Sequence, residues 1–236
     1  SHGEGAVELN NAKLAAAGSH PFNQLLFLGS LAHRFCNEQT LQVKLVSERY
    51  REENFRVGGV ADEASGMQLN RDNWNVSAGH TWLIGSDKLN NLHLQFGRKA
   101  FDEPNNSDAM SEYFTFGTTL ITGSNIVGDQ EMTGDYWELR DTYQFFLGGD
   151  RSSHDLKLGG SYQNIKEDWD YPVFPHGMLW WANDTRTLPY RYDYAVGDPR
   201  TKVKTNLFGV FAQDTWRVGR NVTVSLGLRW DYDTDG

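Results

Sequence analysis

Residues 222–232 alternate between apolar and polar side chains without a break. Every second residue from Val222 to Tyr232 is apolar, and Thr, Ser, Gly, Arg and Asp stand between them. A period of two places the apolar side chains on one face of a β-strand and the polar ones on the other. Such a strand, rising about 3.3 Å per residue and tilted by about 45°, is about 23 Å high, close to the apolar band of a transmembrane β-barrel. A half-buried strand of a soluble β-sandwich alternates in the same way, so this stretch alone leaves both structures open.

The same period recurs in seven other segments, and the eight together make four hairpins. In 73–84 the alternation is nearly as regular, with Trp74 and Trp82 at the two ends of the apolar face. Tryptophan at both ends of an apolar face is typical of strands that cross a membrane between two aromatic girdles. The expected strands are 23–35, 41–53, 73–84, 92–97, 137–147, 156–163, 203–218 and 222–232.

The facing of one expected strand stays open. In 203–218, Phe208, Val210 and Ala212 lie on one face, while Leu207 and Phe211 lie on the other. Both sets contain large apolar side chains, so the period gives no preference between them. The sequence predicts a strand here without predicting which face is apolar.

Connections of two lengths alternate along the chain. The connections within hairpins have about three to six residues, and those between hairpins have about 14, 34 and 35 residues. Structureless loops of more than about 15 residues are uncommon in compact soluble domains. Short turns on one rim and long loops on the other are typical of outer-membrane barrels. The sequence thus predicts an all-β fold, an antiparallel up-and-down transmembrane β-barrel segment of about eight strands. We expect residues 1–21 to be an irregular lead-in with a weak helical run at 12–17, and residues 22–236 to hold the strands and loops of one barrel domain.

Composition excludes several other classes of protein. The mean hydropathy is −0.60, and no apolar run approaches the roughly 20 residues that a membrane-spanning helix needs. The formal net charge of −9 leaves no basic surface for phosphates, so we expect no nucleic-acid partner. The single cysteine, Cys36, excludes an internal disulfide. Aromatic residues make up 13% of the chain, which suits a protein that is anchored at a membrane interface or binds ligands by stacking.

No catalytic or metal-binding motif is recognisable. The chain lacks G-x-S-x-G, H-E-x-x-H, a phosphate-binding loop and paired cysteines, and its seven histidines do not fall at metal-ligand spacings. We therefore expect no enzymatic activity, no metal and no cofactor. Residues 231–236 match the D-x-D-x-D-G opening of a calcium loop, and residues 100–139 contain eight carboxylates and no Lys or Arg. We favour a solvated loop as the interpretation of both.

The connection 168–199 is the strongest candidate for ligand recognition. It contains eight aromatic residues and four of the six prolines, which lower the entropy lost on ordering. We expect it either to fold on itself as a cap or to contact a ligand such as a sugar, a peptide or a large chelate. The candidate ligand-binding residues are Trp169, Trp180, Trp181, Tyr190 and Tyr192.

The last hairpin resembles the barrel of TonB-dependent outer-membrane receptors. In that family a strand of the pattern FAQD-aromatic-basic is followed by one of the pattern LTL-LGLRYD. Residues 211–214, together with Gly227, Leu228, Arg229 and Asp231, match these patterns. A second segment, 153–160, is similar to an H-L-K-G-G strand of the same group. The chain looks closest to the Oar-like receptors, which carry an N-terminal carboxypeptidase-regulatory-like domain.

The resemblance implies a receptor in the outer membrane of a Gram-negative type of cell. Its partners would be membrane lipid, a large nutrient ligand, and the TonB complex, which supplies energy through a plug domain. Family members have a plug and about 22 strands, and this chain contains neither the plug nor the remaining strands. We therefore expect it to be an internal part of a larger barrel.

A soluble or surface-exposed β-rich binding module is the alternative, directed to carbohydrate through Trp180 and Trp181. The two hypotheses differ in where the apolar faces point. In a barrel they face lipid around a polar interior, and in a soluble module they pack into a dry core. The residues that decide between them are Trp74, Val76, Trp82, Val222, Leu226 and Trp230.

Overall fold

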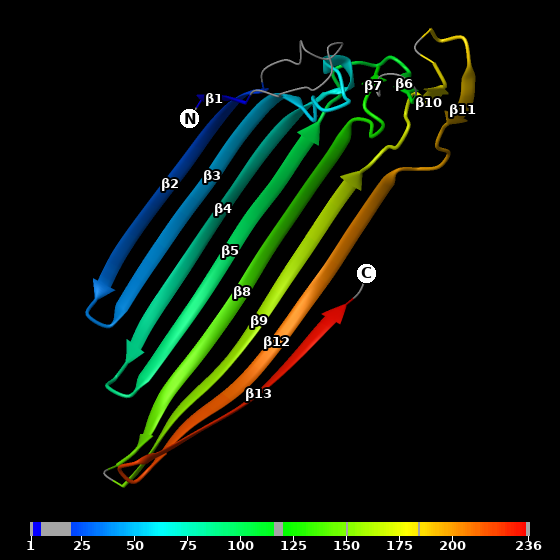
Figure 1. Ribbon diagram of the computed structural model, residues 1–236. Helices are drawn as coiled ribbons and strands as arrows, with labels where there is room; N and C mark the ends of the chain where they lie inside the picture. The colour runs from blue at the N-terminus through cyan, green and yellow to red at the C-terminus, as the bar shows by residue number, and fades with distance from the viewer. Residues whose placement is uncertain (1, 6–19, 116–119, 150, 184, 235–236) are drawn as a thin grey trace.

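The chain forms two β-sheets, one of long strands and one of short strands (Figure 1). The computed structural model describes residues 2–5, 20–115, 120–149, 151–183 and 185–234. The long sheet has the order β1-β2-β3-β4-β5-β8-β9-β12-β13, and every neighbouring pair is antiparallel. Each long strand therefore pairs with the next long strand in the sequence, which confirms the predicted all-β, antiparallel up-and-down fold. The long sheet is open, with β1 and β13 at its edges.

Eight long strands make the four predicted hairpins. They extend further than the sequence pattern predicted, in most cases because a strand continues past its apolar band into residues that are polar on both faces and show no period of two. For example, β8 was expected from residue 137 and begins at Gln130. The long strands are β2 (His20–Cys36), β3 (Gln39–Phe55), β4 (Met67–Ile84), β5 (Lys88–Glu103), β8 (Gln130–Gly148), β9 (Ser152–Asp170), β12 (Arg200–Val218) and β13 (Val222–Thr234).

The segment expected as an irregular lead-in contains one short strand. Strand β1 (His2–Gly5) pairs with the first residues of β2. The weak helical run expected at 12–17 lies outside the described residues.

Short and long connections lie at opposite ends of the long sheet (Figure 1). The short turns are 37–38, 85–87, 149–151 and 219–221, and the long connections are 56–66, 104–129 and 171–199. In the turns, Gly85 and Gly219 have φ values of 70° and 62°, a left-handed conformation that glycine adopts without steric cost. The two ends of the sheet thus differ as predicted, with turns on one rim and loops on the other.

The strand register brings the apolar alternations of all eight long strands onto one side of the sheet, which we call the apolar face. Residues directly opposite in an antiparallel pair point to the same side. One such row runs through Leu45, Val76, Phe96 and Trp137 on four successive strands. The deciding residues all belong to this face: Trp74, Val76, Trp82, Val222, Leu226 and Trp230.

Burial on the long sheet is the reverse of that in a soluble sandwich. On the apolar face, Phe96, Val210 and Leu228 are 49%, 53% and 78% exposed, whereas Gly97 and Gly209 on the opposite, polar face are buried. Every substantial contact of a described long strand with another strand is with a hydrogen-bonded neighbour, so no second layer covers the apolar face. The expectation of a dry core between sheets, which belongs to the soluble module, is not met.

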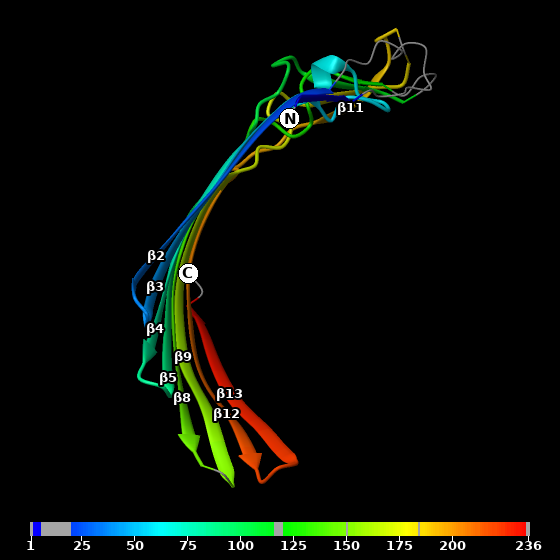
Figure 2. The ribbon, with the colours of Figure 1, turned by 90° about the vertical axis from the view of Figure 1, so that its left-hand side faces the viewer.

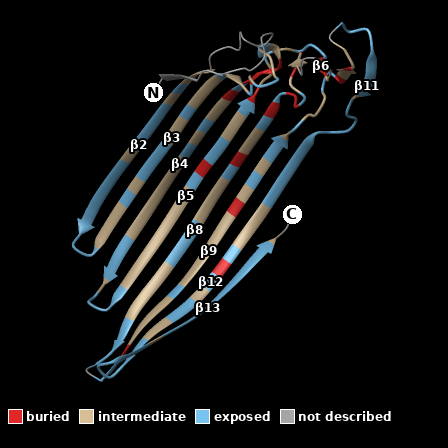
Figure 3. Ribbon diagram, viewed as in Figure 1, coloured by how far each residue is buried: buried red, intermediate tan, exposed pale blue. Residues whose placement is uncertain are grey.

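The small core lies instead among the long connections and the strand ends beside them (Figure 3). Its buried apolar side chains are Val57, Met67, Leu69, Phe114, Val127, Met178 and Trp181. Among the described residues, no helix is long and apolar enough to cross a bilayer.

The register also settles the facing of β12. Phe208, Val210 and Ala212 lie opposite Tyr232, Trp230 and Leu228 of β13, on the apolar face. Phe211 points to the polar face, where its ring covers Gly159 so closely that a Cβ added there would be 2.3 Å from the ring. Tyr136 covers Gly97 in the same way, with a ring carbon 2.5 Å from the position of an added Cβ.

The sheet curves along the length of its strands (Figure 2).

Candidate functional site

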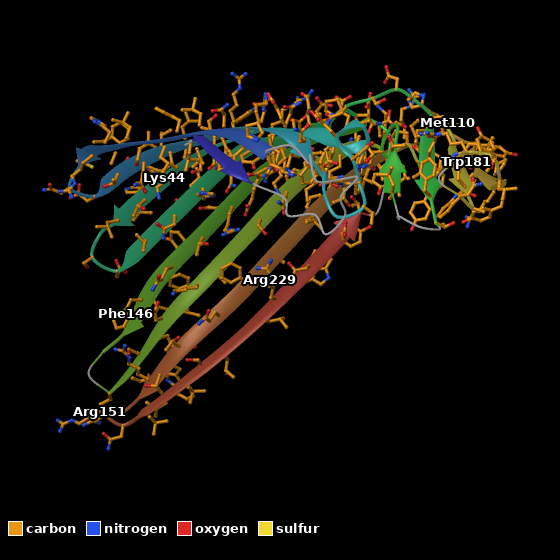
Figure 4. The ribbon with its side chains drawn as sticks, turned by 45° about the horizontal axis from the view of Figure 1, so that its top comes forward. Lys44, Met110, Phe146, Arg151, Trp181 and Arg229 are labelled. Atoms are coloured by element: carbon orange, nitrogen blue, oxygen red, sulfur yellow. The ribbon has the colours of Figure 1, made fainter. Side chains whose placement is uncertain are left out.

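The long connections fold together into a second sheet beyond the end of the long strands, which we call the loop sheet (Figure 1). Its order is β11-β10-β6-β7, with β6 (Ser111–Phe114), β7 (Leu120–Thr122), β10 (Met178–Trp181) and β11 (Pro189–Asp193). Strand β10 is parallel to β6 and antiparallel to β11. Two connections that are distant in sequence therefore make one structure, whereas the cap interpretation expected 168–199 to fold only on itself. Figure 4 shows Met110 and Trp181 at this end of the molecule and Phe146 and Arg151 at the opposite end.

Trp181 lies in the core of the loop sheet. It is 9% exposed, and its ring stacks on Phe114 at 6.5 Å. Its indole Nε1 donates to Glu112 Oε1 at 3.3 Å, and Glu112 Oε2 accepts from Arg186 Nη2 at 2.6 Å. The hydrogen bond with Glu112 raises the pKa of Arg186. The guanidinium of Arg186 also lies 4.9 Å from the centre of the Phe114 ring. These contacts make Trp181 a structural residue that joins the two connections.

Trp180 is enclosed by side chains of the loop sheet. The Tyr113 ring lies 4.4 Å from its ring and the Arg191 guanidinium lies 4.9 Å from it. Its Nε1 donates to Asp193 Oδ2 at 2.7 Å, and Arg191 Nε donates to the other oxygen of Asp193 at 2.8 Å. The hydrogen bond from Arg191 is the main reason why the pKa of Asp193 is lowered, and the Trp180 bond acts in the same direction. Trp180 is therefore held by its own chain from several sides.

Tyr190 and Tyr192 on β11 are open to solvent. Each is 53% exposed. The Tyr190 ring lies 6.5 Å from Trp180, and Tyr192 stacks on Tyr194 at 5.9 Å with nearly parallel planes. The Tyr192 hydroxyl lies over Gly177, whose φ is 75° and where an added Cβ would be 2.2 Å from that oxygen. The tyrosines thus present partly exposed rings at the surface of the loop sheet, while the Tyr192 hydroxyl packs against Gly177.

Trp169 belongs to a different part of the structure. It lies near the end of β9, is 44% exposed, and meets the Tyr171 ring edge-on at 5.9 Å. Beside it is an open pocket of about 320 Å³ between β8, β9 and β12. The structure therefore brings Trp180, Trp181, Tyr190 and Tyr192 together in the loop sheet and leaves Trp169 outside it.

A larger polar pocket of about 640 Å³ lies beside the connection 56–66. Its lining residues are Glu53, Asn54, Glu63, Ala64, Gln68, Asn105 and Asn106. Sequence reasoning missed this pocket because the residues come from three separate segments, none of which has a recognisable motif. The only advance signal was the concentration of amides around residues 105–106.

The acidic segment 100–139 is not a solvated loop throughout. Glu103 is 8% exposed, pairs with Arg56 at 3.2 Å and accepts a hydrogen bond from Gln130 at 2.9 Å. Glu112 is bound by Arg186 as described above. The cations that balance these carboxylates come from other segments, which is why the local charge pattern suggested solvation.

No metal site is evident in the part of the chain that the structure describes, where no three His, Cys, Asp or Glu residues form a suitable group. In the candidate calcium loop, Asp231 is bound by Arg229 at 2.6 Å and Asp233 accepts from Thr205 at 2.8 Å. Residues 235–236 of that motif lie outside the described residues.

Comparisons with known proteins agree with the interpretation of the long sheet as part of an outer-membrane barrel. A family model described as an outer membrane beta barrel domain matches residues 3–235. The outer membrane transporter YddB from Escherichia coli superposes with a TM-score of 0.69 at 12% identity, over 96% of this chain and 29% of that one. The ferric preacinetobactin receptor BauA from Acinetobacter baumannii superposes with a TM-score of 0.63 at 9% identity, over 99% of this chain and 36% of that one. The chain spans about a third of the length of either structure, and these identities show a shared fold only. No curated protein matched the sequence.

Proposed function

The chain belongs to the outer membrane β-barrel domain family, and on that basis we propose that it forms part of the wall of a TonB-dependent receptor that takes up a large nutrient. The protein is located in the outer membrane. In this proposal residues 1–236 are one part of a single barrel domain, and further strands complete the ring between β13 and the β1–β2 edge. We place the receptor in the Oar-like subgroup on the sequence patterns of the last hairpin.

The observation that carries the proposal is the uncovered apolar face of the long sheet. It is continuous across eight strands, and large side chains on it stay accessible, with Trp82, Phe96 and Leu228 41%, 49% and 78% exposed. Lipid is the environment in which such a face is stable, and a closed barrel is the form in which strands cross a bilayer without unpaired backbone groups. The loop sheet at one end suits the capture of ligand outside the cell.

In the proposed mechanism, the loop sheet binds the nutrient before it enters the barrel. Tyr190 and Tyr192 would contact the ligand through their exposed rings, with Trp169 at the rim of the barrel wall. Trp180, whose ring lies 6.5 Å from the Tyr190 ring, would support that tyrosine, and Trp181 would hold the loop sheet together by stacking on Phe114. Energy would come from the TonB complex through a plug domain that is not part of these residues.

The proposal can be tested in cells that express the full-length protein. Uptake of labelled sugars, peptides and iron chelates is measured with and without TonB, and the proposal expects one of these classes to enter only when TonB is present. Two exposed rings contribute about 0.5–1.5 kcal/mol each to a stacked contact, so Tyr190→Ser with Tyr192→Ser should weaken ligand binding by about tenfold. Val196→Ser is the matched control, because Val196 lies on the same connection and is 89% exposed. Uptake that does not depend on TonB would contradict the proposal.

A further inference from the structure

Two lysines of the long sheet face each other without a carboxylate between them. Lys166 on β9 and Lys204 on β12 are direct register partners on the side of the apolar face, and both are exposed. Like charges directly opposite each other destabilise a strand pair. Among the described residues neither ammonium group forms an ion pair. A pair of this kind is stabilised when an anion binds between the two groups.

The nearby carboxylates already have partners. Asp135 lies opposite Lys166 on β8, and its carboxylate is 3.5 Å from Arg98 Nη1. Asp168 lies opposite Lys202, and its carboxylate is 3.4 Å from Lys202 Nζ. The local charge is therefore positive, although the whole chain carries a net charge of −9.

The position of the lysine pair relative to the bilayer can be inferred from a row of aromatic rings on the side of the pair that is away from the loops. Neighbouring rings of this row lie 4.7 to 6.5 Å apart, and its members are Phe96, Trp137, Tyr162, Phe208, Tyr232 and Trp230. Such a girdle lies at the level of the lipid headgroups. The Tyr162 hydroxyl donates to Asn206 at 2.8 Å, so the row has a polar edge on its loop side. Lys166 and Lys204 are four residues further towards the loops, about 9 Å higher for tilted strands rising about 3.3 Å per residue.

A hollow in the surface lies at the same place. It has a volume of about 270 Å³ and is lined by Thr133, Asp135, Lys166, Asp168, Lys202, Val203 and Lys204. Its three ammonium groups and one hydroxyl are donors suited to phosphate oxygens. We propose that this hollow binds a phosphate group of an anionic lipid in the outer membrane. The proposal rests on the family membership of the chain and not on the proposed transport function.

The test compares two double variants of the full-length protein in phosphatidylcholine nanodiscs with and without phosphatidylglycerol. Native mass spectrometry counts the phosphatidylglycerol molecules that remain bound after release from the nanodisc. Lys166→Gln with Lys204→Gln should reduce the affinity for phosphatidylglycerol by about tenfold or more, the order expected when two lysines that face anionic lipid are lost. Lys44→Gln with Lys157→Gln removes the same charge from the polar face of the sheet and should leave the affinity unchanged.

Two outcomes would overturn the proposal, and a third would support it. Equal reductions in both double variants would overturn the proposal, because they would indicate a general effect of charge. Displacement of phosphatidylglycerol by millimolar inorganic phosphate would also overturn it, because the hollow would then be a site for the free anion. Retained affinity in Lys166→Arg with Lys204→Arg supports it, and this variant keeps the test valid if the glutamine variant assembles poorly. Transport activity enters none of these readouts.

Discussion

At the scale of single residues, glycines on the polar face provide space for aromatic rings. Tyr136 lies over Gly97 and Phe211 over Gly159, and a β-carbon at either glycine would overlap the ring. Glycine in a strand interior weakens a strand unless something packs on the bare backbone. Here the ring supplies that packing, and it buries apolar surface on a face that is otherwise polar. This explains why the large residues Phe211 and Tyr136 stand among polar neighbours.

Gly159→Ala should therefore destabilise the protein by about 1–3 kcal/mol, the usual cost of overpacking. The added carbon would meet Phe211 Cε1 at 2.3 Å and the backbone oxygen of Asp141 at 2.9 Å, and the backbone atom cannot move aside easily. Unfolding by guanidinium in lipid vesicles measures the change. Gly79→Ala is the matched control, since it lies on the polar face of β4 with no atom within 4 Å, and it should be neutral or slightly stabilising. Equal destabilisation of the two variants would show that the ring contact is not responsible.

At the scale of the elements, the sequence predicted the strands that alternate with a period of two, but not where they end. Eight strands and their hairpin pairing followed from alternation, and the six deciding residues, from Trp74 to Trp230, all lie on the apolar face, as the barrel hypothesis required. The strand ends were wrong by several residues, as at Gln130, because polar residues on both faces hide the period. The facing of β12 needed the register with β13, which depends on partners distant in sequence.

The loop sheet shows the same limit for the candidate site. Aromatic content identified the connection 168–199, but not that Trp181 would be buried against Phe114 of another connection. Nor did it separate the enclosed Trp180 from the exposed Tyr190 and Tyr192. These distinctions depend on parallel pairing between β10 and β6, for which the sequence carries no local signal.

Trp181→Ala should disrupt the loop sheet while leaving the long sheet intact. Removing a buried tryptophan typically costs about 3–5 kcal/mol, and the ring and carboxylate that bind Trp181 both belong to the loop sheet. Hydrogen exchange should therefore accelerate at the amides of β6, β10 and β11, with little change in β4 and β5. Trp169→Ala provides the control, because Trp169 lies outside the loop sheet and is 44% exposed. Faster exchange across the whole long sheet would mean that the two sheets do not open separately.

At the scale of the whole molecule, two environments act on the two faces of one sheet. The apolar face has no protein covering it among the described elements, and the polar face holds charged pairs such as Arg140 with Glu138 and Arg229 with Asp231. In water alone this arrangement would expose a large apolar surface, which favours aggregation. In a bilayer the same surface is stabilised by lipid, and we propose that further strands pair with the open edges β1 and β13 and satisfy their backbone groups there.

The difference between the two environments predicts that one charged substitution destabilises the protein on the apolar face of β13 and changes its stability little on the polar face. Leu228 lies between Leu226 and Trp230 on the apolar face and is 78% exposed, so Leu228→Arg would place a cation in hydrocarbon. Such a cation costs about 2–4 kcal/mol at the middle of a bilayer and about 0–1 kcal/mol at its interfaces, so about 1–2 kcal/mol is expected at Leu228, two residues below Trp230. Ser225→Arg introduces the same side chain on the polar face of the same strand and should change stability little. Folding into phosphatidylcholine vesicles, followed by urea titration, measures both. If Leu228→Arg were as stable as Ser225→Arg, the apolar face could not be in contact with lipid, and the reversed burial of the sheet would need a protein partner to explain it.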